Sequence, residues 1–219
     1  MTYQLVVLDM AGTTVVDDGL VEGAFARAWD RVMGGEGREA ALEHVRATMG
    51  QSKIEVFRGI ADEATAQQLN ERFELAIREL IGEGRCSPIP GAELAIRSLR
   101  AQGLKIAFTT GFSRPTAEAI LAALGWTDLA DALVTPAEAG RGRPAPDMIL
   151  TALIRTGTSS VASVVNVGDT ESDARSGVAA GAGLVVGVLT GSLDAETLHA
   201  AGAGVVLGSV AELPLTLAP

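Results

Sequence analysis

The sequence predicts an α/β fold in which helices cover both faces of a parallel sheet. Three observations lead to this prediction: short apolar runs recur along the chain, segments with helical apolar spacing separate them, and glycines follow several of those segments. Strands that are apolar throughout are typical of a parallel sheet buried between helices. The alternation breaks once, between residues 16 and 88, where no strand pattern occurs.

Each expected strand is a short apolar run bounded by polar or turn-forming residues. These runs are Leu5–Leu8, Leu104–Phe108, Ala132–Val134, Val164–Val167, Leu184–Val188 and the weaker Val205–Leu207. Their lengths suit buried strands. Since no apolar run approaches the roughly 18 residues that a membrane-spanning helix needs, we expect no membrane partner.

Helices are expected between these strands. Apolar spacing predicts them at Ala92–Ala101, Arg114–Leu124, Asp147–Arg155 and Glu171–Ala180. Gly103, Gly125 and Gly181 follow three of these segments, at the place where a left-handed residue commonly ends a helix. The strands and helices together predict alternating β and α units.

The stretch between the first two expected strands contains only helical patterns. These lie at Leu20–Met33, Arg38–Thr48, Ser52–Ile60 and Thr65–Ile81. The stretch is too long for a structureless loop, so we expect an inserted helical domain. We place this cap at residues 16–88 and the core at residues 1–15 and 89–219. The connectors Val16–Gly19 and Gly84–Pro88 would let the cap open and close over a site on the sheet.

Composition narrows the environment and the partners. The 219 residues are 47% hydrophobic and carry a formal net charge of -10, with no basic block, so we expect no nucleic-acid partner. Cys86 is the single cysteine, which excludes an internal disulfide and a cysteine-rich zinc site. The first residues lack the basic start and long apolar region of a signal peptide, and we expect a reducing, cytoplasmic location.

Aspartates follow two of the expected strands. Asp9 comes directly after the first strand, and Asp169 and Asp173 follow Val164–Val167. The carboxyl ends of strands form the binding crevice of an open α/β sheet, so these carboxylates are expected to meet there. Clustered carboxylates suit Mg²⁺, and an aspartate can also act as a nucleophile. Taken singly, each aspartate also fits the plainer role of capping a turn or a helix.

Two further motifs suit a phosphoryl group. Thr110-Gly111 follows the second expected strand, where a hydroxyl and a free backbone N–H can cradle phosphate. Arg143, in Gly-Arg-Pro-Ala-Pro, can clamp a phosphoryl group. Either motif alone is also common in ordinary turns and on solvated surfaces.

The order of these four motifs resembles the haloacid dehalogenase superfamily. The resemblance implies a Rossmann-like core with an inserted helical cap, and a Mg²⁺-dependent phosphoryl transfer through an aspartyl-phosphate on Asp9. It implies that Asp9, the backbone carbonyl of Ala11 and Asp169 hold Mg²⁺, with Asp173 as a direct or water-mediated partner. For the phosphoryl group it implies three further residues: Thr110, Gly111 and Arg143.

Position 11 departs from the phosphatases of that superfamily, which carry a second aspartate there. Losing a positioned acid or base typically costs roughly 10²–10⁴-fold in rate. The segment from Asp9 to Thr14, Arg143 in its Gly-Arg-Pro context, and Met49-Gly50-Gln-Ser-Lys53-Ile resemble the phosphonatase branch instead. That resemblance implies a Schiff base between Lys53 and an aldehyde substrate, with Met49 and Gly50 shaping the cap side of the pocket. Because a protonated imine accepts the electrons of a breaking C–P bond, no leaving oxygen then needs an acid.

Lys53 stands out on composition as well, because Lys53 and Lys105 are the only lysines beside fifteen arginines. Only a primary amine can form an imine, and burial lowers the pKa of an amine.

Val56 stands where the phosphonatases carry a histidine three residues after the lysine. The substrate is therefore expected to be a small phosphonate or a phosphate, and three functions stay open: a C–P hydrolase, a monoester phosphatase or phosphotransferase, and a non-catalytic binding protein. The resemblance also suggests a homodimer formed through the caps.

Overall fold

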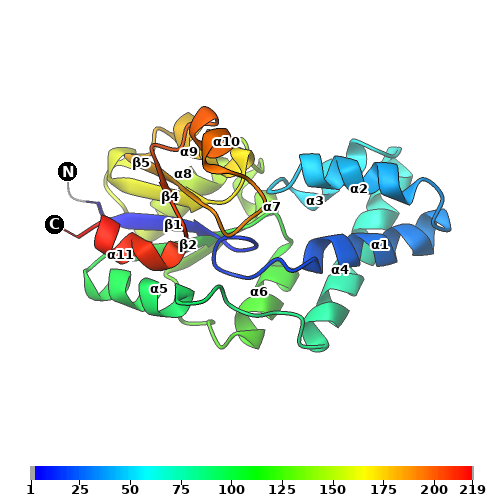
Figure 1. Ribbon diagram of the computed structural model, residues 1–219, viewed down its shortest axis with the longest axis horizontal. Helices are drawn as coiled ribbons and strands as arrows, with labels where there is room; N and C mark the ends of the chain where they lie inside the picture. Colours follow the sequence, from blue (N-terminus) through cyan, green and yellow to red (C-terminus); the bar gives the residue numbers. More distant parts are fainter. Residues whose placement is uncertain (1–2, 219) are drawn as a thin grey trace.

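A six-stranded parallel sheet forms the centre of the computed structural model, which describes residues 3–218 (Figure 1). The strand order is β3-β2-β1-β4-β5-β6, and every neighbouring pair is parallel. The strands are β1 (Leu5–Asp9), β2 (Lys105–Thr109), β3 (Ala132–Val134), β4 (Val164–Gly168), β5 (Leu184–Val188) and β6 (Val205–Leu207). The predicted fold class is confirmed.

The pleat of β1 explains how both faces of the sheet are covered. All five of its residues are buried. Val6 and Leu8 pack in a cluster with apolar residues of α5 (Ala92–Ala101) and α6 (Arg114–Ala123). Leu5 and Val7 point to the opposite face, since side chains alternate along a strand, and pack with α8 (Asp147–Thr156). A strand that is apolar on both faces therefore lies between two helical layers.

Shorter elements complete the sheet-containing part. The helix α9 (Glu171–Ala180) follows β4, and its capping box is formed by Thr170 and Asp173. The remaining elements are the short helices α7 (Pro136–Ala139), α10 (Ala195–Ala200) and α11 (Leu213–Thr216), and the 3₁₀ turns η1 (Val161–Ser163) and η2 (Val210–Glu212). Among residues 3–218, no helix combines the length and the apolar composition that crossing a membrane requires.

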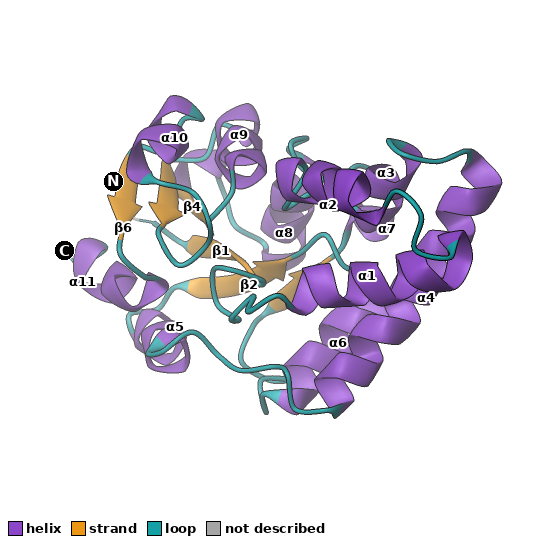
Figure 2. Cartoon of the chain, turned by 45° about the vertical axis from the view of Figure 1, so that its right-hand side comes forward, coloured by secondary structure: helices purple, strands orange, loops and turns teal. Residues whose placement is uncertain are grey.

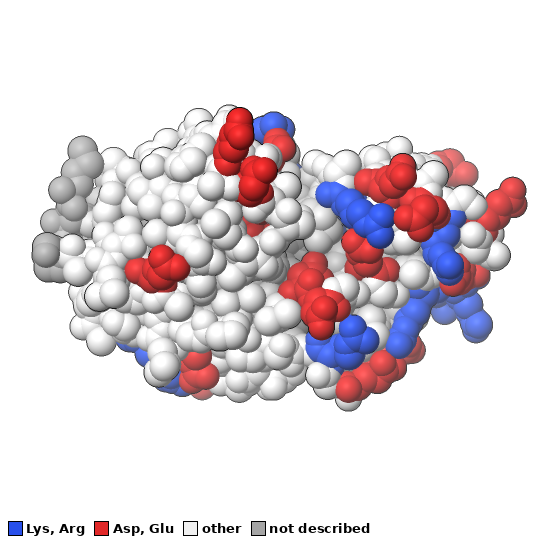
Figure 3. Space-filling model, in the orientation of Figure 1, with Lys and Arg blue, Asp and Glu red and all other residues white. Residues whose placement is uncertain are grey.

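Five helices lie between β1 and β2 in the chain, and the first four of them lie to one side of the sheet in space (Figures 1 and 2). These four are α1 (Leu20–Met33), α2 (Arg38–Ala47), α3 (Lys53–Arg58) and α4 (Glu63–Gly82), and we call residues 20–82 the four-helix segment. Most of the charged side chains on the face in Figure 3 lie over this segment. The segment also carries several exposed Arg–Glu pairs, which contribute little to stability.

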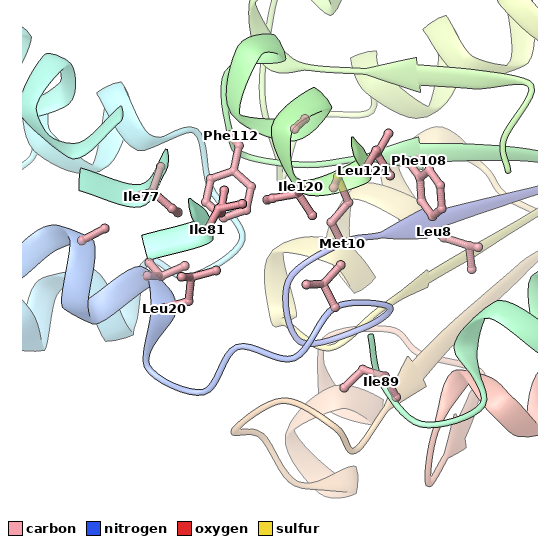
Figure 4. Packing of buried hydrophobic residues seen from close by; sticks show 14 of the residues in the cluster. Leu8, Met10, Leu20, Ile77, Ile81, Ile89, Phe108, Phe112, Ile120 and Leu121 are labelled. Atoms are coloured by element: carbon pink, nitrogen blue, oxygen red, sulfur yellow. The ribbon is translucent and has the colours of Figure 1, made fainter. Parts of the chain in front are cut away.

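The four-helix segment shares a continuous hydrophobic cluster with the sheet-containing part (Figure 4). Leu20 of α1 and Ile81 of α4 lie beside Phe112, which follows β2. Inside the segment, a series of aromatic rings leads toward the sheet: the ring of Phe57 lies 5.9 Å from that of Phe73, which lies 6.5 Å from Phe112. Apolar contact therefore holds the segment against the carboxyl ends of the strands.

Candidate active site

Three aspartates meet at the carboxyl edge of the sheet. Asp9 is the last residue of β1 and is in register with Thr109 at the end of β2. Asp169 follows the last residue of the adjacent strand β4, and Asp173 lies in the first turn of α9. One carboxylate oxygen from each lies within 4.8 Å of the other two, and all three side chains are buried. The structure thus brings together residues that are far apart in the sequence.

Asp169 is enclosed by backbone as well as by side chains. The hydroxyl of Thr13 donates to its Oδ1 at 2.8 Å. A Cβ atom at Gly12 or Gly191 would lie only 2.3 Å or 2.1 Å from its Oδ2. Gly12 also has φ +86°, a conformation that other residues rarely adopt. The fit around this carboxylate therefore requires glycine at both positions.

Asp173 has two roles in this geometry. Its Oδ2 accepts hydrogen bonds from the hydroxyl and the backbone N–H of Thr170, which begins α9. Its Oδ1 lies 2.8 Å from Nε of Arg143. Asp173 therefore caps α9 with one oxygen and contacts Arg143 with the other, and its part in holding a metal stays a prediction.

Arg143 links the aspartates to the four-helix segment. Its guanidinium lies 2.7 Å from Oδ1 of Asp9, and it donates to the hydroxyl of Thr109 at 2.7 Å. It also donates to the backbone carbonyl of Gly50 at 3.3 Å. The residue is only 6% exposed. The planar fork of arginine suits such simultaneous contacts.

The carboxylates at this edge outnumber the cationic side chains that pair with them. Three buried carboxylates face the single guanidinium of Arg143. Burial raises the pKa of Asp9 to about 7 although Arg143 opposes the shift, and burial with the charges of Asp9 and Asp173 raises the pKa of Asp169. Within residues 3–218 the carbonyl of Ala11 accepts no hydrogen bond and stays available as a ligand. Oxygen donors with excess negative charge suit Mg²⁺, so these residues fit the ion that the family resemblance implies.

The loop after β2 lies directly under the four-helix segment. Thr110 is buried, and its hydroxyl oxygen accepts the N–H of Phe112 at 3.2 Å. The carbonyl of Gly111 accepts the N–H of Lys53 at 3.3 Å. A Cβ atom at Gly111 would lie 2.2 Å from the carbonyl oxygen of Gln51. Glycine here permits the closest approach between the segment and this phosphate-binding candidate.

Lys53 is the first residue of α3 and is buried. Its Nζ lies 5.5 Å from the ring centroid of Phe112, and no hydrogen bond or ion pair of Nζ occurs within the described part of the chain. Burial lowers the pKa of this amine, and the charges of Asp17 and Asp9 oppose that shift. Lys105, by contrast, is exposed, and its Nζ donates to the carbonyl of Thr156.

A cavity of about 20 Å³ lies between Lys53 and the aspartates. Roughly 10–15 Å³ of such volume holds one water molecule, so the cavity has room for about one. With the exception of Asp173, its walls include every residue that the sequence predicts for the site: Asp9, Ala11, Met49, Gly50, Lys53, Thr110, Gly111, Arg143 and Asp169. The four-helix segment and the sheet each supply part of this wall.

Some residues of the site were not predicted. Phe112 lies under the Lys53 amine, Thr13 holds Asp169, and Thr109 holds Arg143. Phe112 follows Thr110-Gly111 directly, and Thr13 lies within the first motif, so their positions in the sequence were a usable signal. Thr109 gave no such signal, because threonine is a common residue within strands.

The family model of the haloacid dehalogenase-like hydrolases matches residues 3–181. The chain belongs to this family. As a haloacid dehalogenase-like hydrolase, it carries its aspartates, Arg143 and Thr110 at the edge of the sheet where the motifs predicted them.

Several relatives of this haloacid dehalogenase-like hydrolase carry more specific names. A phosphonoacetaldehyde hydrolase of Bacillus cereus is 34% identical over 210 residues, which cover 88% of this chain and 78% of the relative. A bifunctional phosphonoacetaldehyde hydrolase/aminoethylphosphonate transaminase of Clostridioides difficile is 33% identical over 198 residues, which cover 80% of this chain but only 30% of that longer protein. A solved phosphonoacetaldehyde hydrolase-like protein from Oleispira antarctica superimposes with a TM-score of 0.85 at 25% identity, covering 99% of this chain and 92% of that one.

Proposed function

We propose that this hydrolase is Mg²⁺-dependent and cleaves the C–P bond of a small carbonyl phosphonate of the phosphonoacetaldehyde kind. The observation that carries the proposal is Lys53, a buried amine without an ionic partner in the described chain, which lines the same cavity as Asp9. A solvated surface lysine is not buried and does not line a cavity together with a candidate nucleophile. The names of the relatives in Bacillus cereus and Clostridioides difficile support the same substrate class.

Lys53 would form an imine with the substrate carbonyl. Its amine adds to the carbonyl carbon, and loss of water leaves a protonated C=N bond. The low pKa that burial imposes on Lys53 favours the neutral, nucleophilic amine. Phe112 lies near enough to stabilise the cationic forms through its ring.

Asp9 would then attack phosphorus. An Asp9 oxygen forms the new O–P bond while the C–P bond breaks. The electron pair of the C–P bond moves into the imine and gives an enamine on Lys53. Water later releases phosphate from Asp9, and protonation and hydrolysis of the enamine release the aldehyde and the amine. Arg143 and the Thr110-Gly111 loop would hold the phosphoryl oxygens, and bound Mg²⁺ would supply the positive charge that offsets repulsion between carboxylate and substrate.

The four-helix segment would act as the cap of this enzyme. A cavity of about 20 Å³ does not hold a phosphonate together with its carbon chain, so the segment must move away before substrate binds. Closure would then exclude water from the imine. The connectors at residues 16–19 and 84–88 join the segment to the sheet at neighbouring positions, since Val16 N–H donates to the Ser87 carbonyl at 2.9 Å.

Lys53→Arg tests the proposal. The guanidinium keeps the positive charge but forms no imine, so we expect loss of Mg²⁺-dependent phosphate release from phosphonoacetaldehyde. Lys105→Arg is the matched control at the chain's other, exposed lysine, and it should keep the wild-type rate. Borohydride added with substrate should attach the carbon chain to Lys53 alone. Turnover that survives Lys53→Arg would show the imine mechanism to be wrong.

The second candidate function is hydrolysis of phosphate monoesters, because Asp9 and Arg143 suit either kind of phosphoryl transfer. Ala11 favours the first candidate, since a monoesterase needs an acid for its leaving oxygen. Ala11→Asp should therefore raise monoester hydrolysis at least tenfold from a low basal rate, measured with a panel of small phosphate esters. A wild-type enzyme that releases phosphate from esters and not from the phosphonate would favour the monoesterase. Mg²⁺-dependent binding without any turnover would instead indicate a binding protein.

A further inference from the structure

Asp17 lies beside the wall of the reaction cavity. It belongs to the connector between β1 and α1, and its Oδ1 accepts the N–H of Val21 at 3.1 Å. Val21 lines the cavity that Lys53 and Asp9 share. The hydrogen bond therefore fixes the Asp17 carboxylate next to that wall.

Asp17 also lines a second, larger space. This cleft measures about 470 Å³, and Met49, Asp169 and Thr170 line both it and the reaction cavity. Asp17 thus lines the cleft, in which Met49, Asp169 and Thr170 also form part of the cavity wall. Figure 3 shows acidic side chains where the four-helix segment meets the sheet-containing part. A proton or a water molecule that leaves the cavity for this cleft would reach a space that the Asp17 carboxylate lines.

The charges of three carboxylates, Asp17, Asp9 and Glu74, act on the Lys53 amine, and two of these carboxylates are engaged elsewhere. Asp9 is paired with Arg143. Glu74 of α4 accepts hydrogen bonds from the hydroxyls of Ser113 and Thr116. Within the described residues, no side chain pairs with Asp17; its carboxylate accepts the N–H of Val21, and the N–H of Leu20 also lowers its pKa.

Burial brings the pKa values of Asp17 and Lys53 closer to each other. Burial raises the pKa of Asp17, while the backbone N–H groups of Val21 and Leu20 and the charge of Lys53 oppose the shift and Glu22 adds to it. Burial lowers the pKa of Lys53, while Asp17, Asp9 and Glu74 oppose the shift and Arg143 adds to it. Proton exchange between two groups is easier when their acidities are closer.

We propose that Asp17 is the proton-transfer residue for imine formation at Lys53, in a chain where Val56 replaces the histidine expected on α3. This inference rests on the proposed function, because it concerns the imine step of that reaction. It differs from the role of Asp9, which reacts at phosphorus. No residue of the described metal-binding cluster is involved.

The proton and atom balance of the step is complete. Because no carboxylate oxygen of the described residues pairs with Nζ directly, the Asp17 carboxylate takes a proton from the Lys53 ammonium through one intervening water, and the resulting amine adds to the carbonyl carbon. The nitrogen's extra proton moves to the carbonyl oxygen, which gives a neutral carbinolamine. The Asp17 carboxyl then protonates the hydroxyl, the C–O bond breaks, and water leaves. Asp17 ends as a carboxylate and Lys53 as a protonated imine.

Asp17→Asn tests the inference, with Asp18→Asn as the matched control at the exposed neighbouring residue. The amide oxygen that Asp17→Asn introduces can still accept the Val21 N–H, so the start of α1 should be kept. We expect Asp17→Asn to lower kcat/KM for phosphonoacetaldehyde by about 100-fold or more, within the range for loss of an acid or base. The rate at which borohydride traps the imine should fall equally. Asp17→Ala, which removes the side chain, should recover part of this trapping rate in added acetate.

The outcomes separate the inference from the proposed function. If Lys53→Arg is inactive and imine is trapped, but Asp17→Asn matches Asp18→Asn, then Asp17 has no such role and the C–P reaction stands. A purely electrostatic effect of Asp17 would shift the pH profile of trapping to lower pH without lowering its plateau, and would equally overturn the inference. If the wild-type chain neither turns over phosphonoacetaldehyde nor traps it, the proposed function fails first. If the rate of imine trapping fell in Glu74→Gln and not in Asp17→Asn, the proton transfer would be assigned to Glu74 and the inference would be overturned.

Discussion

Arg143 joins three parts of the molecule through one side chain. Its guanidinium contacts Asp9 on β1, Asp173 on α9 and the Gly50 carbonyl in the loop before α3. Nη1 contacts both Asp9 and the Gly50 carbonyl while Nε contacts Asp173, and a lysine ammonium, which is a single point charge, lacks this planar set of donors. Arginine at this position therefore orients the Asp9 carboxylate and contacts the four-helix segment where it lies against the sheet.

The Arg143→Lys variant should be strongly impaired although the charge is kept. We expect kcat to fall by roughly 100-fold or more, the range found when one donor to a developing charge is removed. Arg141→Lys is the control, because Arg141 is exposed and pairs only with Asp147 within the described chain. The measurement is steady-state phosphate release in saturating Mg²⁺. Equal rates for the two variants would mean that a point charge suffices at position 143.

At the scale of whole elements, the four-helix segment contacts the sheet-containing part through close backbone approaches that leave no room for an added Cβ atom. The Gly50 backbone lies against Thr170, where a Cβ atom would be 2.5 Å from the hydroxyl oxygen, and Gly111 lies against Gln51. Glu74 of α4 adds a polar contact at the start of α6 through Ser113. If the segment opens and closes as proposed, these contacts would form only on full closure, and closure would complete the cavity.

The Gly111→Ala substitution should hinder closure. Its Cβ atom would lie 2.2 Å from the Gln51 carbonyl, far inside contact distance, so the segment must stay further from the sheet. We expect kcat/KM to fall at least tenfold and trypsin to cleave faster after Arg85 in the second connector. Gly82→Ala is the control, since a Cβ atom at the end of α4 meets nothing within 4 Å. Unchanged kinetics in Gly111→Ala would show that the closed arrangement is not required for catalysis.

The long elements and the aspartates were predictable for physical reasons. Apolar spacing defines helices such as Leu20–Met33 over several turns, and parallel strands bring their carboxyl ends to one edge, which places Asp9 beside Asp169. The short helix Pro136–Ala139 was missed because four residues carry no periodicity. Phe112 and Asp17 were not assigned to the site because their importance depends on how the four-helix segment folds back over the sheet.

For the molecule as a whole, the buried negative charges at the carboxyl edge of the sheet lower the stability of the folded state. Asp9, Asp169 and Asp173 are buried around one guanidinium, and a folded chain without metal must either protonate a carboxylate or accept their repulsion. Burial in the folded state raises the pKa of Asp9 to about 7, from 3.8 for an unperturbed aspartate. Stability should therefore respond to both pH and Mg²⁺.

The sign of this response follows from proton binding. Between pH 4 and about pH 7 the folded, metal-free chain holds more protons than the unfolded chain, so its stability falls as pH rises through that window. Mg²⁺ bound by these carboxylates would replace those protons, so calorimetry should show a larger Mg²⁺-induced rise in Tm at pH 8 than at pH 5. At a hundredfold excess over its Kd, a ligand of the folded state contributes about 2.7 kcal/mol. Asp169→Asn, the control, should remove most of the Mg²⁺ effect and stabilise the metal-free chain at pH 8. An equal Tm shift at both pH values would mean that the three aspartates do not hold the ion.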